Sequence, residues 1–144
     1  MRELKLPATI DSINRVTDFV DRELEKIGCP IKNVYQINIA IDELLANISM
    51  YAYEKSGEAI VQYEVERSPA AVVLRFIDSG VPYNPLDKED PDVTLSAEQR
   101  KIGGLGIFMV KQSMDHVSYE YKDRKNIVTI KKIIDMGGKS NDDQ

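Results

Sequence analysis

The spacing of apolar residues in the first third of the chain predicts a strand followed by two helices. Residues 3–6 alternate charged and apolar side chains, as a half-buried strand does, before Pro7 interrupts and Asp11 offers a helix cap. Two apolar stripes at helical spacing follow, made of Ile13, Val16, Phe19, Val20, Leu24 and Ile27, and of Val34, Ile37, Ile41, Leu44, Leu45 and Ile48. Gly28-Cys29-Pro30 separates these two predicted helices, and the second is expected to end around residues 53–57.

The middle of the chain changes to a period of two and then loses its periodicity. Two β-rich runs, 59–66 and 71–77, are separated by Arg67-Ser68-Pro69, which has the composition of a turn, so they predict a hairpin. Residues 79–102 hold several prolines and many charges without a sustained apolar period. A loop of this length is more often a lid or a binding loop than a plain connection.

The last third of the chain predicts one more helix and two strands. A glycine turn at 103–106 opens an apolar helix, and strands are expected at about 116–122 and 126–134. This order of elements predicts an α+β fold, a two-layer α/β sandwich with helices packed on one face of a mixed, mostly antiparallel sheet and a lid loop beside it. We predict one domain over residues 1–135 and a flexible tail over residues 136–144.

Charge and composition exclude several classes of function. Nineteen Lys and Arg against 24 Asp and Glu give a net charge of −5, which repels a phosphate backbone, so nucleic-acid binding is not expected. The single cysteine, Cys29, has no partner for a disulfide or a zinc site, which indicates a structural thiol in a reducing compartment. No apolar run approaches the roughly 20 residues of a membrane span. We therefore expect a cytoplasmic protein.

The second predicted helix carries a carboxylate and an amide that can point into one cleft. Glu43 and Asn47 are four residues apart, so their side chains lie on one face of the helix, beside its apolar stripe. Polar pairs at this spacing are also common on solvated helix faces. Taken alone, the spacing favours the solvated interpretation.

An acidic residue and a glycine follow the buried strand of the predicted hairpin. Asp78 at the strand end can accept a hydrogen bond from an exocyclic amine, and Gly80 can admit a flat ring. The alternative is a turn in which Asp78 is a cap and Gly80 supplies a positive φ.

The glycine turn before the third helix is a candidate phosphate site. Gly103, Gly104 and Gly106 place backbone amides and a helix N-terminus where an anion can be received. The turn lacks the Gly-Lys-Ser/Thr ending of a P-loop and the Gly-x-Gly-x-x-Gly spacing of a dinucleotide fold. It therefore indicates a phosphate site of another type.

In this order, the three segments resemble the GHKL (Bergerat-fold) ATPase superfamily and, within it, the small anti-sigma-factor serine kinases of bacteria. The match runs through Asp42-Glu43-Leu44-Leu45-Ala46-Asn47 with Tyr51-Ala52-Tyr53, then through residues 76–85, and then through residues 102–107. It continues through Met114-Asp115, Tyr119 and the strand 126–130, and covers nearly the whole chain apart from the tail.

The resemblance implies a role for each matching position. Asn47 would help hold Mg²⁺, and Glu43 would be the general base. Asp78 would accept a hydrogen bond from the adenine amine, Gly80 would let the base approach, and Thr129 would support the adenine contact through water. The three glycines of the turn would cradle the phosphates of ATP.

Two positions, one just before the glycine turn and one in the first matching segment, leave alternatives open. Arg100 is expected to reach the terminal phosphate and contribute to catalysis, with Lys101 as the other candidate, although both also fit solvated charges of the lid. Tyr51 stands where many relatives have histidine, which changes the hydrogen bonding expected near the phosphates.

The function implied by the resemblance is an ATP- and Mg²⁺-dependent protein-serine/threonine kinase. It would phosphorylate an anti-sigma-factor antagonist protein and, in its other partner state, sequester a sigma factor; relatives often form homodimers. The alternative is a non-catalytic switch that uses ATP to order its lid and bind a partner protein. Autophosphorylation on histidine is not expected, because His116 lies at a strand start.

Overall fold

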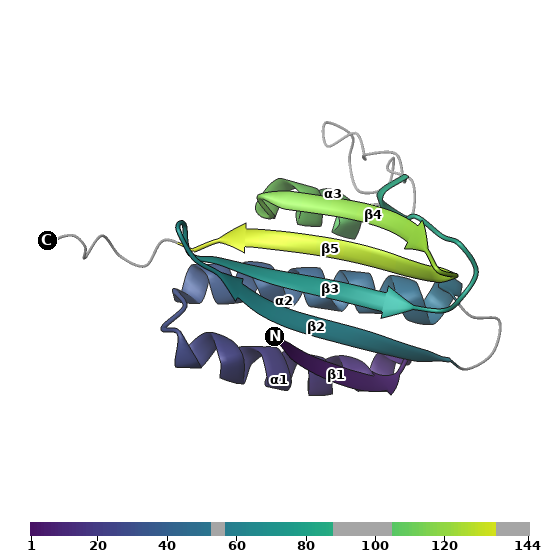
Figure 1. Cartoon of the computed structure of the whole chain (residues 1–144), viewed down its shortest axis with the longest axis horizontal. Coiled ribbons are helices and arrows are strands. Elements are labelled where there is room, and N and C mark those ends of the chain that lie inside the picture. The colour runs from purple at the N-terminus through teal and green to yellow at the C-terminus, as the bar shows by residue number, and fades with distance from the viewer. Residues whose placement is uncertain (53–56, 88–104, 135–144) are drawn as a thin grey trace, which may run out of the picture.

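Two layers make up the structure, a computed structural model that describes residues 1–52, 57–87 and 105–134 (Figure 1). The helices are α1 (Ile13–Lys26), α2 (Ile31–Asn47) and α3 (Leu105–Ser113). The strands are β1 (Arg2–Pro7), β2 (Glu58–Glu66), β3 (Ala71–Asp78), β4 (His116–Lys122) and β5 (Lys125–Ile133). Short helical turns occupy Ile10–Ser12, Ile48–Ala52 and Pro85–Asp87.

The strands form one five-stranded sheet in the order β1-β2-β3-β5-β4, and each neighbouring pair is antiparallel. All three helices cover the same face of this sheet (Figure 1). The predicted α+β sandwich and its hairpin are therefore confirmed, and the sheet is antiparallel throughout the described residues rather than mixed.

The core lies between the helices and one face of the sheet. In β2, Ala59, Val61 and Tyr63 are buried, whereas the alternating residues belong to the open face. The fully buried side chains from both layers include Phe76, Leu24, Ile37, Ile41, Leu44, Leu74, Ile107 and Ile130. Their burial fixes the register of the sheet, because a slip by one residue would turn each strand's apolar side chains to water.

The helix ends differ in detail from the prediction. Asp11 is exposed within the 3₁₀ turn Ile10–Ser12, and Ser12 occupies the N-cap position of α1, so the predicted Asp11 cap is wrong. The 3₁₀ turn forms ahead of α1, because the backbone N–H of Ser12 donates to the Thr9 carbonyl at 3.0 Å. α2 ends at Asn47, and a π-helical turn carries the chain on to Ala52.

The described residues also bear on two expectations from composition. None of the helices in ranges 1–52, 57–87 and 105–134 is long and apolar enough to cross a membrane. Burial raises the pKa of the Cys29 thiol, which agrees with a structural thiol rather than a reactive one. The predicted tail, residues 136–144, lies outside the description.

Candidate functional site

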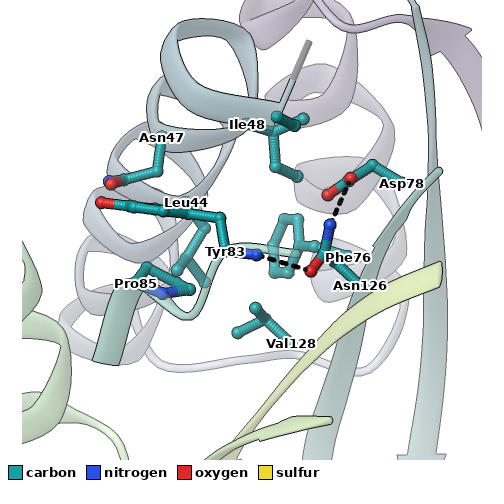
Figure 2. A pocket seen from close by; sticks show the side chains of 10 residues that line it. Leu44, Asn47, Ile48, Phe76, Asp78, Tyr83, Pro85, Asn126 and Val128 are labelled. Atoms are coloured by element: carbon teal, nitrogen blue, oxygen red, sulfur yellow. Dashed lines mark hydrogen bonds between the residues drawn. The ribbon is translucent and has the colours of Figure 1, made fainter. Parts of the chain in front are cut away.

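A pocket lies where the C-terminal half of α2 meets the ends of β3 and β5 and the segment 79–87 that follows β3 (Figure 2). It contains about 310 Å³ of space not filled by atoms, including the part open to solvent. The lining is mostly apolar and consists of Leu44, Asn47, Ile48, Ala52, Phe76, Asp78, Tyr83, Pro85, Asn126 and Val128.

Asp78 presents a buried carboxylate to this pocket. Its residue is 5% exposed, and its Oδ1 accepts hydrogen bonds from the Gly80 backbone N–H and from Asn126 Nδ2, both at 2.9 Å. No described residue donates to Oδ2. Asp78 therefore combines one saturated oxygen with one that can accept a hydrogen bond from a ligand.

Burial is the main influence on the acidity of this carboxyl. It raises the pKa of Asp78 above the ordinary 3.8, and the hydrogen bonds from Asn126 and Gly80 lower it in part. A buried carboxylate with an unused acceptor is costly, because its lost hydration is not fully replaced. The site therefore favours a ligand that brings a hydrogen-bond donor to Oδ2.

Asn126, which the sequence analysis missed, fixes the position of Asp78. It is 2% exposed and lies directly opposite Asp78 in the β3–β5 register. Its Nδ2 also donates to the Val81 carbonyl at 2.8 Å, while its Oδ1 accepts from the Tyr83 N–H at 3.0 Å and from the Tyr119 hydroxyl. Figure 2 shows the amide between Asp78 and Tyr83. One side chain thus joins β3, β4, β5 and the segment 79–87.

Asn126→Ala is expected to lower the free energy of unfolding by about 2–4 kcal/mol, because it removes four hydrogen bonds and leaves buried polar groups unpaired. Urea unfolding measures the loss. Thr129→Ala, three residues along the same strand on the open face, is the matched control and is expected to cost less than about 1 kcal/mol. Equal effects of the two substitutions would contradict the role assigned to Asn126.

Thr129 does not lie in the pocket. Residues Asn126, Val128 and Ile130 of β5 are buried against the helices, so Thr129 between them belongs to the other face, where its register partners are Arg75 and Ser118. Asp78 is on the helix-covered face. The structure therefore contradicts the predicted contribution of Thr129 to the adenine contact, and Asn126 is the β5 residue that meets Asp78.

At position 80, the structure shows which protein atoms leave no space for a side chain. A Cβ at this position would lie 2.0 Å from the Ala52 carbonyl oxygen and 2.5 Å from its carbon. The neighbouring Val81 N–H donates to the same oxygen at 2.8 Å. The absent side chain thus leaves room for the π-helical turn, and the hydrogen bond from Val81 attaches the segment 79–87 to that turn. The predicted contact of Gly80 with the base stays a prediction.

Gly80→Ala is expected to destabilise the fold by about 3 kcal/mol, because the new methyl group meets backbone atoms that cannot turn aside. Denaturant unfolding tests this. Val81→Ala keeps the backbone hydrogen bond and alters a side chain that is 59% exposed, so it is expected to change stability by less than about 0.5 kcal/mol. A Gly80→Ala protein as stable as this control would exclude the steric explanation.

An aromatic stack also connects the segment 79–87 to the π-helical turn. Tyr51 of the π-helical turn stacks on Tyr83, with ring centroids 4.9 Å apart and planes inclined by 27°. Tyr83 also lines the pocket, so the stack joins the π-helical turn to a residue of the pocket wall. The tyrosine at position 51, noted as a departure from histidine, supplies this aromatic contact.

Glu43 and Asn47 form a hydrogen-bonded pair at the α2 side of the pocket. Asn47 Nδ2 donates to the Glu43 carbonyl and to Glu43 Oε2, both at 2.7 Å. Two acceptors around one amide fix its orientation, so the oxygen points the other way. Asn47 is 4% exposed, and its Oδ1 is buried with no hydrogen-bond partner in the described part of the chain.

Gly106, in the first turn of α3, lies against this pair. A Cβ there would be 1.9 Å from Glu43 Oε1. The other predicted residues of the phosphate turn, Gly103 and Gly104, lie outside the described residues, as do Arg100 and Lys101. The structure therefore brings Glu43, Asn47 and Gly106 together, and the remaining assignments stay predictions.

Residues 6–132 match the family described as histidine kinase-like ATPase domain. The chain belongs to this family. It is 26% identical over 136 residues to the serine-protein kinase RsbW of Listeria monocytogenes, covering 90% of this chain and 85% of the relative. It is 25% identical over 123 residues to RsbW of Bacillus licheniformis, covering 80% and 74%, and 25% identical over 96 residues to the serine/threonine-protein kinase BtrW of Bordetella bronchiseptica, covering 67% and 68%.

The residues of this histidine kinase-like ATPase domain fit a magnesium ion that arrives with a nucleotide. Asn47 Oδ1 is a buried oxygen beside a carboxylate, no group in the described part of the chain donates to it, and Mg²⁺ prefers oxygen ligands. Within the described ranges, no group of three or more His, Cys, Asp and Glu side chains could hold a metal. Mg²⁺ at this place would therefore take its other ligands from phosphates and water.

Proposed function

We propose that this chain is an ATP-dependent protein serine kinase whose nucleotide binds in the pocket between α2 and the ends of β3 and β5. The observation that carries the proposal is the buried Asp78 carboxylate in the wall of an apolar pocket. Its Oδ1 accepts two hydrogen bonds, whereas none of the described residues donates to its Oδ2. Adenine combines a flat apolar ring with an exocyclic amine, which matches both the lining and the unused acceptor. Family membership supports the same ligand.

The α2 end of the pocket supplies the chemistry. Asn47 Oδ1 is the proposed protein ligand of Mg²⁺, which would neutralise charge on the phosphates. The serine oxygen attacks the γ-phosphorus, the bond from that phosphorus to the bridging oxygen breaks, and ADP leaves. Glu43 accepts the hydroxyl proton, and the hydrogen bond from Asn47 holds its carboxylate in place.

The partners in this proposal come from the resemblance and from the names of the relatives. Three relatives are named as serine or serine/threonine protein kinases, which supports serine as the acceptor. The resemblance to anti-sigma-factor kinases adds a serine-bearing antagonist as substrate, a sigma factor as the sequestered partner, a homodimer as the assembly and the cytoplasm as the location. The Glu43–Asn47 pair favours this kinase over a purely nucleotide-dependent binding switch.

Incubation of the purified protein with labelled ATP, Mg²⁺ and the candidate antagonist tests the proposal. We expect one phosphoserine on the antagonist, located by mass spectrometry, and no transfer when the acceptor serine is changed to alanine. Tight ATP binding without phosphorylation of an antagonist that demonstrably binds the protein would exclude the kinase and leave the binding switch.

A further inference from the structure

The glycine at position 106 touches the proposed general base rather than open space. An alanine Cβ built there would lie 1.9 Å from Glu43 Oε1, 2.3 Å from Glu43 Cδ and 2.9 Å from Glu43 Oε2. All three atoms belong to one carboxylate. The contact joins α2 and α3, because Glu43 is in the former and Gly106 in the first turn of the latter.

The carboxylate is held from two directions. Asn47 Nδ2 donates to Oε2 at 2.7 Å, and Oε1 lies against the α-carbon side of Gly106, where a methyl group would overlap it. The Asn47 amide fixes the position of Oε2, and the absence of a side chain at Gly106 leaves space for Oε1. A carboxylate near the first turn of α3 is also on the favourable side of the helix dipole.

We propose that Gly106 is a positioning residue for phosphoryl transfer, whose absent side chain determines where the Glu43 carboxylate lies. This inference rests on the proposed kinase function. It differs from the phosphate-cradle role that the resemblance implies, because the space freed by the glycine is occupied by protein. If Gly106 positions Glu43, a methyl group at this position should lower kcat. If Gly106 cradles the phosphates, the methyl group should weaken ATP binding.

The geometry predicts how an alanine at position 106 would be accommodated. The overlapping atoms are the far end of a flexible side chain, so Glu43 can swing away while both backbones stay in place. The displaced carboxylate loses its 2.7 Å hydrogen bond from Asn47 and its position for receiving a proton. Alanine is also a better helix former than glycine, so the fold is expected to persist.

The test compares Gly106→Ala with wild type for ATP·Mg²⁺ affinity by calorimetry and for phosphoryl transfer under saturating nucleotide. We expect kcat to fall by about 10–100-fold, as for a displaced general base, with the dissociation constant of ATP changed by less than about threefold. Gln112→Ala, at an exposed position of α3, is the control and should leave both unchanged. A loss of ATP affinity as large as the loss of kcat, or an unchanged kcat, would overturn the proposal.

A double-mutant cycle in urea unfolding measures the contact without activity. Gly106→Ala should be more stabilising in a Glu43→Ala background than in wild type, because the overlapping carboxylate is gone. Equal effects in both backgrounds would overturn the inference. If wild type transfers no phosphate to a genuine partner, the proposed function fails by itself, and the unfolding cycle still decides whether Gly106 places Glu43.

Discussion

Glu43→Gln is expected to reduce phosphoryl transfer by about 10²- to 10⁴-fold while leaving the dissociation constant of ATP·Mg²⁺ within about threefold of wild type. Glutamine keeps the length of the side chain, and its carbonyl oxygen can still accept the hydrogen bond from Asn47 that Glu43 Oε2 accepts at 2.7 Å. Its amide cannot receive the proton of a serine hydroxyl. The substitution therefore removes the base with little change to the packing around Gly106.

The matched control for this prediction is Asp42→Asn. Asp42 is the preceding residue of α2 and is exposed, so this change removes one negative charge nearby without touching the Glu43–Asn47 pair. Transfer to a purified antagonist, measured in a single turnover with labelled ATP, separates the variants. Transfer by Glu43→Gln at the rate of Asp42→Asn would assign proton removal to another group.

The sequence predicted those site residues whose spacing reflects a single element. Glu43 and Asn47 share a helix face because they are four residues apart, and the structure places their side chains within 2.7 Å. Asp78 ends an apolar strand, which makes it buried and close to the edge of the core. In both cases the local pattern predicts the helix face or the strand end on which the side chain lies. The choice of a binding site over a solvated face or a turn came from the resemblance.

The error at Thr129 has a physical cause in the composition of β5. The run Ile127-Val128-Thr129-Ile130 is apolar or β-branched at every position, so alternation cannot tell which residues face the helices. A shift of one residue exchanges the faces. The pairing of Asn126 with Asp78 decides which residues of β5 face the helices, and it joins two residues that are 48 positions apart in sequence.

The surroundings of the glycines could not be predicted from the sequence either. A sequence can indicate that a side chain is not tolerated, but it does not identify the atoms that fill the space. At Gly80 they are backbone atoms of Ala52, and at Gly106 they are the carboxylate of Glu43. Both glycines thus shape the site through protein contacts, and their direct contacts with ATP stay predictions.

Asp78→Asn is expected to weaken ATP binding by about 100-fold and to remove most of the thermal stabilisation by ATP·Mg²⁺. The asparagine oxygen can keep the hydrogen bonds that Gly80 and Asn126 donate to Oδ1 at 2.9 Å, so its NH₂ group takes the place of Oδ2. A donor then faces the donor of the adenine amine. The substitution replaces one hydrogen-bond acceptor in the pocket by a donor, while the hydrogen bonds from Gly80 and Asn126 persist.

Inosine triphosphate makes this prediction specific, because it carries a carbonyl oxygen where ATP carries the amine. Wild type is expected to prefer ATP, whereas Asp78→Asn should lose that preference or reverse it, since its NH₂ can donate to the carbonyl. Asp87→Asn, an exposed change in the same segment, is the control and should keep the wild-type preference. General damage to the pocket would weaken the binding of both nucleotides equally. A changed ratio of the two affinities, measured by calorimetry, therefore assigns base recognition to Asp78 Oδ2, to which no described residue donates.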